Sequence, residues 1–166
     1  MTEHAILELE RFLPYRLSVL SNRISQDIAR LYAGRFGLNV TEWRLLAVLG
    51  RYPSLSATDL VERTAMDKVA VSRAVASLLA DGRLTRKTDG SDRRRALLRL
   101  SAKGYRIYDE VAPLALAYER ELLAGLGSDE RAALERLLEM VEARERATRV
   151  AGAAADVSRG AAPRLT

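Results

Sequence analysis

Nine basic side chains crowd into the segment from Arg83 to Arg106, where only Asp89 and Asp92 oppose them. This segment has a formal charge of +7, which exceeds the +5 of the whole chain and leaves −2 for all other residues. Three of its arginines are adjacent, at positions 93–95. Adjacent cations repel one another unless a polyanion lies nearby, so the segment is predicted to bind the phosphates of a nucleic acid.

The pattern within this basic segment predicts a β-hairpin. Residues 84–88 and 96–100 are strand-like, and an Asp-Gly pair, typical of hairpin turns, follows the first of them. The tip then presents Arg93 and Arg94 to a DNA minor groove, where a narrow A·T tract concentrates negative potential. The alternatives are a guard on an edge strand or an ordinary solvated loop. Arg86 and Lys87, on the first strand, are assigned to phosphates.

Two short helices joined by a tight turn are predicted before the hairpin. Ser56 and Asp59 can cap the first helix, and a break follows at residues 65–66. Asp67 can cap the second helix, and Gly82 can end it. This arrangement is typical of a helix-turn-helix.

The second of these helices, residues 69–79, has two different faces. Val71, Val75 and Leu78 fall within a narrow arc and are predicted to face the core. The opposite side is slim and carries the candidate DNA contacts Lys68, Val69, Ser72 and Arg73. A slim face can enter a major groove about 12 Å wide, and an outward valine can touch a thymine methyl group. The alternative is an ordinary solvated helix face.

Three stretches of the sequence resemble the MarR family of winged-helix regulators. They are LLADGRLTRK at 78–87, DGSDRR at 89–94 and LRLSAKG at 98–104, and the order of elements is similar from Leu13 to Arg146. The resemblance implies a homodimer on a pseudo-palindromic operator, usually a repressor that a small ligand releases. It also implies that Asp92 holds a wing arginine through a charge-assisted bond, with Arg94 first and Arg93 second in the minor groove.

Long helices are predicted on both sides of the winged segment. Leucines and isoleucines form one apolar stripe along 13–36, and Thr41 is the expected cap of a helix over 42–52. Ser101 is expected to start a helix that runs towards Leu126. Ser128 is the expected cap of a last helix that ends near Arg149.

The expected fold is therefore mainly α with a small β-hairpin wing. Residues 38–101 form the winged helix-turn-helix core, and residues 1–37 and 102–149 supply helices for dimerisation. Residues 150–166, rich in Ala and Gly, are expected to be a disordered tail.

A ligand pocket is predicted between the long helices and the winged core. Its candidate residues combine aromatic rings with two cations that can pair with a carboxylate or phosphate: Tyr15, Arg16, Arg23, Trp43 and Tyr108. Packing of these rings in a dimer core is the alternative. Residues 13–25 are similar to first helices of MarR-like regulators that answer to hydroxycinnamoyl-CoA thioesters, which suggests an aromatic acid or an aryl-CoA thioester as effector.

Composition argues against several other classes of protein. The chain has no cysteine and one histidine, His4, so no disulfide, metal site, cofactor or catalytic triad is predicted. Neither a secretory signal nor a membrane-spanning run is visible, which predicts a cytoplasmic protein without a membrane partner. Two alternatives stay open: an acid/base enzyme using Glu110 with Tyr108, and a non-specific nucleoid-type DNA- or RNA-binding protein.

Overall fold

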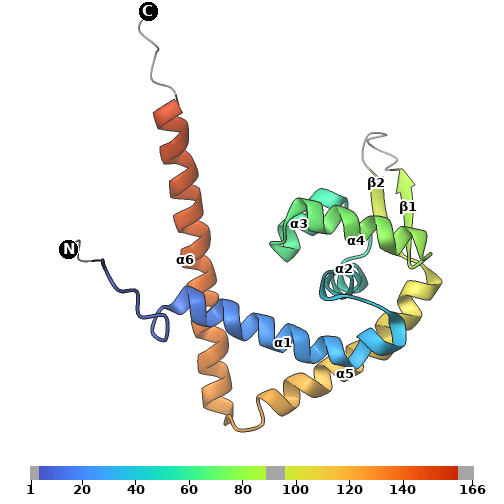
Figure 1. Ribbon diagram of the computed structural model, residues 1–166, viewed down its shortest axis with the longest axis horizontal. Helices are drawn as coiled ribbons and strands as arrows, with labels where there is room; N and C mark the ends of the chain where they lie inside the picture. The colour runs from blue at the N-terminus through green and yellow to red at the C-terminus, as the bar shows by residue number, and fades with distance from the viewer. Residues whose placement is uncertain (1–3, 89–95, 161–166) are drawn as a thin grey trace, which may run out of the picture. The chain divides into compact units, whose positions relative to one another are not determined.

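The computed structural model describes residues 4–88 and 96–160, with side chains as far as residue 151. The chain divides into two compact units, residues 1–119 and 120–166 (Figure 1). The elements follow in the order α1 (Leu13–Phe36), α2 (Val40–Arg51), α3 (Ala57–Thr64), α4 (Lys68–Ala80), β1 (Leu84–Thr88), β2 (Ala96–Leu100), α5 (Ala102–Leu122) and α6 (Ser128–Gly160). The structure thus confirms the predicted mainly α fold with one hairpin.

Helix α1 has the bounds that its apolar periodicity predicts. Pro14 lies in the first turn, where its missing N–H breaks no helical hydrogen bond. Gly37 ends the helix in the left-handed region, with φ of 60°, and donates its N–H to the carbonyl of Ala33 at 2.8 Å.

The predicted start of α2 was wrong, because Asn39 rather than Thr41 is its N-cap. The Asn39 side chain accepts a hydrogen bond from the Glu42 N–H, and the Glu42 carboxylate accepts one from the Asn39 N–H, both at 2.9 Å. This reciprocal pair is a capping box, and Asn is a stronger N-cap than Thr. The helix therefore begins at Val40 and ends at Arg51, not at Tyr52.

Helices α3 and α4 form the predicted helix-turn-helix. The Ser56 hydroxyl and Asp59 carboxylate form the expected capping box, and Ala65 makes the turn with φ of 51°. Asp67 caps α4 by accepting hydrogen bonds from two backbone N–H groups of its first turn. Gly82, with φ of 65°, turns the chain into β1.

The hairpin strands also have their predicted bounds. β1 and β2 pair antiparallel, with Leu84 opposite Leu100 and Arg86 opposite Leu98. A bridge between Leu55 and Leu98 adds the segment before α3 to the other edge of β2. Residues 89–95, which form the predicted turn and tip, lie outside the described residues.

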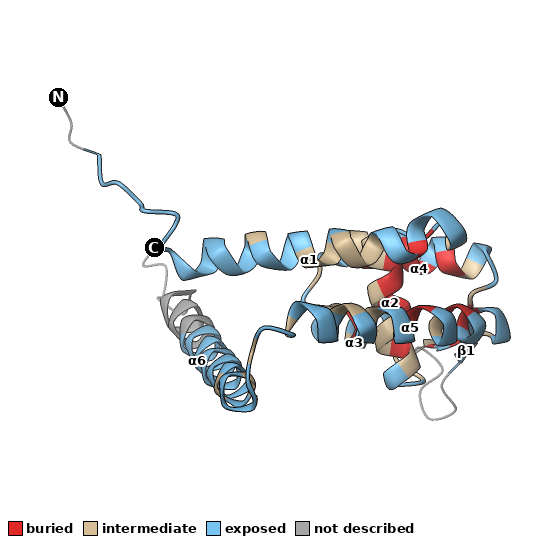
Figure 2. Cartoon of the chain, turned by 90° about the horizontal axis from the view of Figure 1, so that it is seen from below, coloured by how far each residue is buried: buried red, intermediate tan, exposed pale blue. Residues whose placement is uncertain are grey.

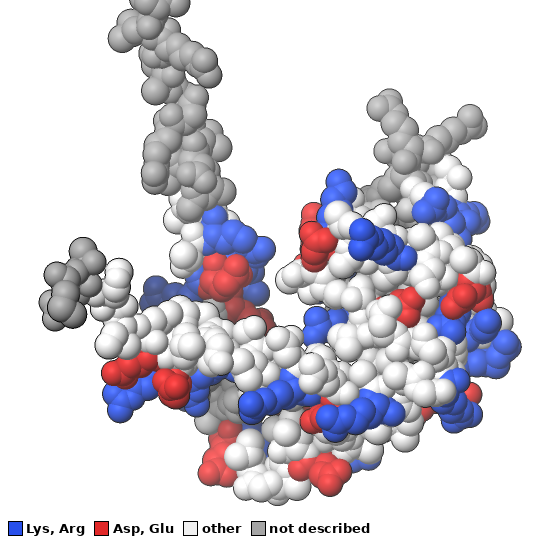
Figure 3. All heavy atoms as spheres, viewed as in Figure 1, with Lys and Arg blue, Asp and Glu red and all other residues white. Residues whose placement is uncertain are grey.

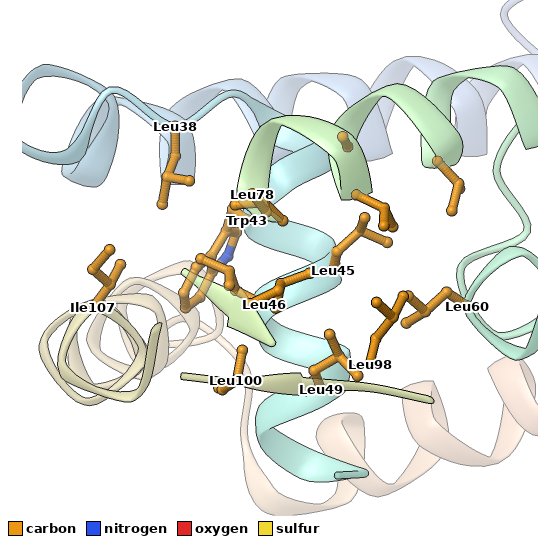
Figure 4. Close-up of a cluster of buried hydrophobic side chains, with 14 of the residues drawn as sticks. Leu38, Trp43, Leu45, Leu46, Leu49, Leu60, Leu78, Leu98, Leu100 and Ile107 are labelled. Carbon is orange, nitrogen blue, oxygen red and sulfur yellow. The ribbon is translucent and has the colours of Figure 1, made fainter. Parts of the chain in front are cut away.

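One apolar core holds the winged part of the chain together (Figure 4). Helix α2 lies at its centre and contacts α1, α3, α4 and β2. The most deeply buried large side chains come from α2 itself and from α1, α3, α4, β2 and α5: Tyr32, Leu45, Leu46, Leu49, Leu60, Val71, Leu78, Leu98 and Val111. Figure 2 shows this burial in red, whereas the N-terminal half of α1 is pale blue. The core therefore packs α4 and the hairpin strand β2 against the same helix, α2.

Two boundaries near the C-terminus differ from the sequence prediction. Helix α5 begins as expected after Ser101, whose hydroxyl accepts a hydrogen bond from the Gly104 N–H, but it ends at Leu122 instead of near Leu126. Helix α6 is capped from Gly127, not from Ser128, because the Gly127 N–H donates to the Glu130 carboxylate at 2.8 Å. The helix does not end near Arg149: residues 150–160, expected to be disordered, continue it.

Candidate nucleic-acid interface

The outer face of α4 presents the predicted DNA contacts together. Lys68, Val69, Ser72 and Arg73 are all exposed. The predicted inner stripe is buried, as Val71, Val75 and Leu78 are at most 4% exposed. Val69 is 55% exposed, which is unusual for a valine and leaves its methyl groups free for contact. One face of α4 is thus committed to the core and the other is available to a partner.

Two grooves border this exposed face. The first runs between α3 and α4, with Thr58 on one wall and Lys68 and Ser72 on the other. The second separates α4 from the start of α2 and is lined by Thr41, Arg73 and other residues of the two helices. The first turn of a helix carries partial positive charge. The second groove therefore has the positive end of α2 on one side and Arg73 on the other.

The hairpin adds further basic residues next to α4. Arg86 and Lys87 are exposed on β1, which contacts α4. Figure 3 shows Lys and Arg side chains (blue) on the part of the surface that α4 and the hairpin form. The predicted minor-groove residues Asp92, Arg93 and Arg94 fall within 89–95 and lie outside the described residues.

The structure separates the five predicted ligand residues into two groups. Tyr15, Arg16 and Arg23 line one open hollow on the N-terminal half of α1, with a volume of about 390 Å³. This volume lies in the range of small-molecule pockets. Trp43 and Tyr108 do not line that hollow; their rings stack on each other with centroids 6.3 Å apart.

Trp43 and Tyr108 belong to a buried aromatic cluster with Tyr32. The rings of Tyr32 and Trp43 lie 5.5 Å apart, and Tyr32 is 1% exposed. Its hydroxyl has no hydrogen-bond partner within residues 4–88 and 96–151. Burial raises the pKa of this hydroxyl to about 12, and the Arg44 guanidinium opposes part of the rise. These three rings thus pack in the core of this chain, whereas the alternative weighed for the aromatic residues was packing in a dimer core.

Sequence patterns did not reveal two long-range polar contacts at the C-terminal end of α4, one of which lies in the groove beside Arg73. The buried Glu42 carboxylate accepts a hydrogen bond from the Ser77 hydroxyl at 2.6 Å. Arg83 donates from Nη2 to the carbonyl of Phe36 at 2.6 Å. The spacing of Asn39 and Glu42 indicates a capping box, but no local signal points to partners this distant.

Glu110 and Tyr108, the suggested acid/base pair, have separate partners in the structure. Glu110, the suggested acid or base, forms an exposed ion pair with Arg35, while Tyr108 stacks on Trp43. Residues 4–88 and 96–160 contain no group of three potential metal ligands. Within the same ranges, no helix has both the length and the apolar character needed to cross a membrane.

Comparisons with known proteins agree with this geometry. Residues 36–95 match the sequence profile of the MarR family. A curated relative from Clostridium symbiosum, named HTH-type transcriptional regulator BilQ, is 29% identical over 91 residues. That match covers 55% of this chain and spans 63% of the relative's length.

Solved structures extend the likeness beyond the profile. A mutant MarR from E. coli, complexed with operator DNA, has a TM-score of 0.69 at 23% identity, covering 82% of this chain and 99% of that one. The PcaV transcriptional regulator from Streptomyces coelicolor, in complex with its natural ligand, has a TM-score of 0.65 at 25% identity, covering 84% and 97%. The fold is thus a winged helix-turn-helix of the MarR type. Residues 36–95 of this chain are therefore similar to the MarR family of transcriptional regulators, and its fold is similar to that of solved MarR structures.

Proposed function

We propose that the chain is a sequence-specific DNA-binding transcriptional regulator that acts as a homodimer. The observation that carries this proposal is the exposed, slim, basic face of α4 beside a basic hairpin. Residues 38–101 form the DNA-binding part. The E. coli MarR mutant, which has this fold, was crystallised with operator DNA, and that supports the same use here.

Each candidate residue has a distinct role in the proposed complex. Arg73 contacts base edges in the major groove, with Val69 against a thymine methyl group and Lys68 and Ser72 beside them. Arg86 and Lys87 contact phosphates, which set the position of the protein without selecting a sequence. Arg94 and Arg93 enter the minor groove, and Asp92 holds them there.

The partner of the exposed apolar stripes is proposed to be a second copy of the chain. Leu13, Leu17 and Leu20 are 39–52% exposed on α1, and Leu134, Leu137 and Leu138 are 39–51% exposed on α6. Figure 3 shows largely uncharged surface (white) on α1 towards its N-terminus. Such stripes need an apolar partner, and a two-fold dimer gives each copy the same one. The dimer then places two α4 helices on half-sites about 10 bp apart.

A small effector is proposed to control DNA binding. The hollow on α1 brings Arg16 and Arg23 beside Tyr15 and the leucines of the proposed dimer contact. An aromatic acid or an aryl-CoA thioester is therefore proposed to bind at the edge of that contact. The PcaV structure with its natural ligand supports a ligand response in this fold. The effector lowers operator affinity only if it binds more tightly to an arrangement of α4 helices that does not fit DNA. The chain then acts as a repressor in the cytoplasm.

Gel-shift titration of matched variants tests the DNA-binding roles. Arg73→Ala should weaken binding by about 1–3 kcal/mol at one base position and relax the preference there. Lys87→Ala should weaken binding to all duplexes alike. Arg30→Ala is the control, because Arg30 is exposed on α1 and pairs only locally with Asp27. An Arg73→Ala variant with unchanged affinity and preference would remove α4 from the interface.

Competition with unlabelled random DNA separates specific from non-specific binding. A specific regulator should discriminate by about 10³-fold or more at physiological salt. A nucleoid-type protein should lose all discrimination under the same conditions, because phosphate contacts carry no sequence information.

A further inference from the structure

Two buried charged side chains tie the C-terminal end of α4 to the junction between α1 and α2. Glu42 is 6% exposed and Arg83 is 11% exposed as a side chain. Charged groups are rarely this buried unless they are paired, because leaving water costs free energy. Each of these side chains makes one hydrogen bond to a distant segment of the chain.

The first tie joins α2 to α4. One oxygen of the Glu42 carboxylate accepts from the Asn39 N–H and so completes the cap of α2. The other oxygen accepts from the Ser77 hydroxyl on α4 at 2.6 Å, a short, charge-assisted hydrogen bond. The same carboxylate therefore fixes the start of α2 and the last turns of α4.

The second tie joins the end of α1 to the turn after α4. Nη2 of Arg83 donates to the Phe36 carbonyl at 2.6 Å and lies 3.4 Å from the Asp81 carboxylate. Nε and Nη1 are buried and have no partner within the described residues. Burying two unpaired donors is costly, and an apolar side chain would fill the site at lower cost. The cation thus has a use other than filling space.

Both ties have one partner within residues 36–42, so both connect the end of α4 to the junction between α1 and α2. The Phe36 carbonyl belongs to the last residue of α1, and Glu42 lies in the first turn of α2. Apolar contacts of α4 with the core allow small rotations and slides, since they are not directional. Two directional hydrogen bonds near one end of α4 restrict those motions.

We infer that Glu42 and Arg83 are positioning residues that hold α4 at the angle at which its outer face can select base pairs. Their assigned role in the proposed complex is to position α4, and the Glu42–Ser77 pair lines the groove beside Arg73. The inference rests on the proposed function and adds to it that the end of α1 is joined to the recognition helix. A displacement of α1 is then transmitted to α4 through these two side chains.

The ratio of affinities for a selected operator duplex and a random duplex tests the inference. Ser77→Ala removes the first tie, Ser77→Thr keeps its hydroxyl, and Arg83→Met removes the second tie while preserving apolar volume. The control is Arg30→Met, which breaks an exposed local pair on α1. Melting temperatures are measured in parallel, and affinities are scaled to the folded fraction.

Ser77→Ala and Arg83→Met should lower the specific-to-random ratio about 3- to 10-fold, with random-duplex affinity changed less than about 2-fold. Ser77→Thr and Arg30→Met should keep the wild-type ratio. An unchanged specific-to-random ratio in a folded Ser77→Ala protein would overturn the inference. If Arg83→Met does not fold, the result for Ser77→Ala is sufficient to test the inference. An equal loss of affinity for the operator duplex and the random duplex would also overturn the inference, because it would indicate a merely structural role. A wild-type chain without any preference would instead overturn the proposed function itself.

Discussion

Helices α4 and α1 both carry an apolar stripe at helical spacing, but the two stripes meet different surroundings. On α4, Val71, Val75 and Leu78 are buried against the core of the same chain. On α1, Leu13, Leu17 and Leu20 remain exposed. Periodicity predicts that a face will be covered, but it does not say whether the cover comes from the same chain. The core of the same chain positions α4, and in the proposed dimer a second copy covers the N-terminal half of α1.

Truncating one leucine in each region gives the largest expected contrast. Leu78→Ala, on α4, removes a fully buried side chain and should lower the free energy of unfolding by about 2–5 kcal/mol at every protein concentration. Leu20→Ala, at a residue that is 52% exposed, should lower it only when the dimer is populated. Chemical denaturation at two widely separated protein concentrations distinguishes the two cases. If both substitutions lowered the free energy of unfolding by a similar amount at both protein concentrations, the proposed difference between the two regions would be contradicted.

Charges on the α1 stripe should break the association without unfolding the subunit. Leu17→Glu combined with Leu20→Glu places two carboxylates in the proposed dimer contact, at a cost of about 2–4 kcal/mol of association free energy. Sedimentation should show a shift towards monomer, and circular dichroism should show retained helix. Ser18→Glu combined with Ser21→Glu, on the same helix but off the stripe, is the matched control. A wild-type protein that is monomeric at high concentration would contradict the dimer.

Replacing either of two glycines by alanine should change stability by a smaller amount, and the two changes should have opposite signs. A Cβ at Gly104 would overlap the Arg83 carbonyl oxygen, so Gly104→Ala should cost about 1–3 kcal/mol. A Cβ at Gly34, in α1, meets nothing within 4 Å, so Gly34→Ala should stabilise the helix by about 0.5–1 kcal/mol. Thermal melting of both variants checks the signs. If both substitutions changed the melting temperature in the same direction, the surroundings of one glycine would not be as described.

The smallest effect is expected at Tyr32. Its pKa is raised to about 12 in the folded chain, so the unfolded chain, with a pKa near 10, loses this proton first. Stability from this group is present below pH 10 and should disappear as the pH rises towards about 12. Tyr32→Phe should remove that part of the alkaline loss and change the free energy of unfolding at pH 7 by less than about 1 kcal/mol.

Unfolding curves from pH 8 to 12 for wild type, Tyr32→Phe and the exposed control Tyr15→Phe measure this difference. An alkaline loss as steep in Tyr32→Phe as in wild type would show that another group causes it.

Local signals explain why so much of the fold was predictable. Gly37, Ser56, Asp67 and Gly82 act on their own neighbours, so the sequence alone predicts where the helices near them begin or end. The same rule explains the error at α2, where two adjacent capping signals compete and the complete box at Asn39 prevails over Thr41.

The hydrogen bonds of Glu42 and Arg83 that position α4 were not predictable from the sequence, because each joins residues that are far apart in the chain. Glu42 and Ser77 are separated by 35 positions, and Phe36 and Arg83 by 47. Only the packed core brings such residues together. Composition likewise suggested five ligand residues as one set, although Tyr15 and Arg23 belong to the hollow on α1 and Trp43 to the buried cluster.

Selection of bound sequences from a pool of random duplexes tests the central claim most directly. Two copies of α4, projected by one symmetric dimer, should enrich an inverted repeat whose half-sites are centred about 10 bp apart. Arg73→Ala should degrade the same position in both half-sites. Recovery of unenriched random sequences at physiological salt, or of a single site without symmetry, would contradict the account.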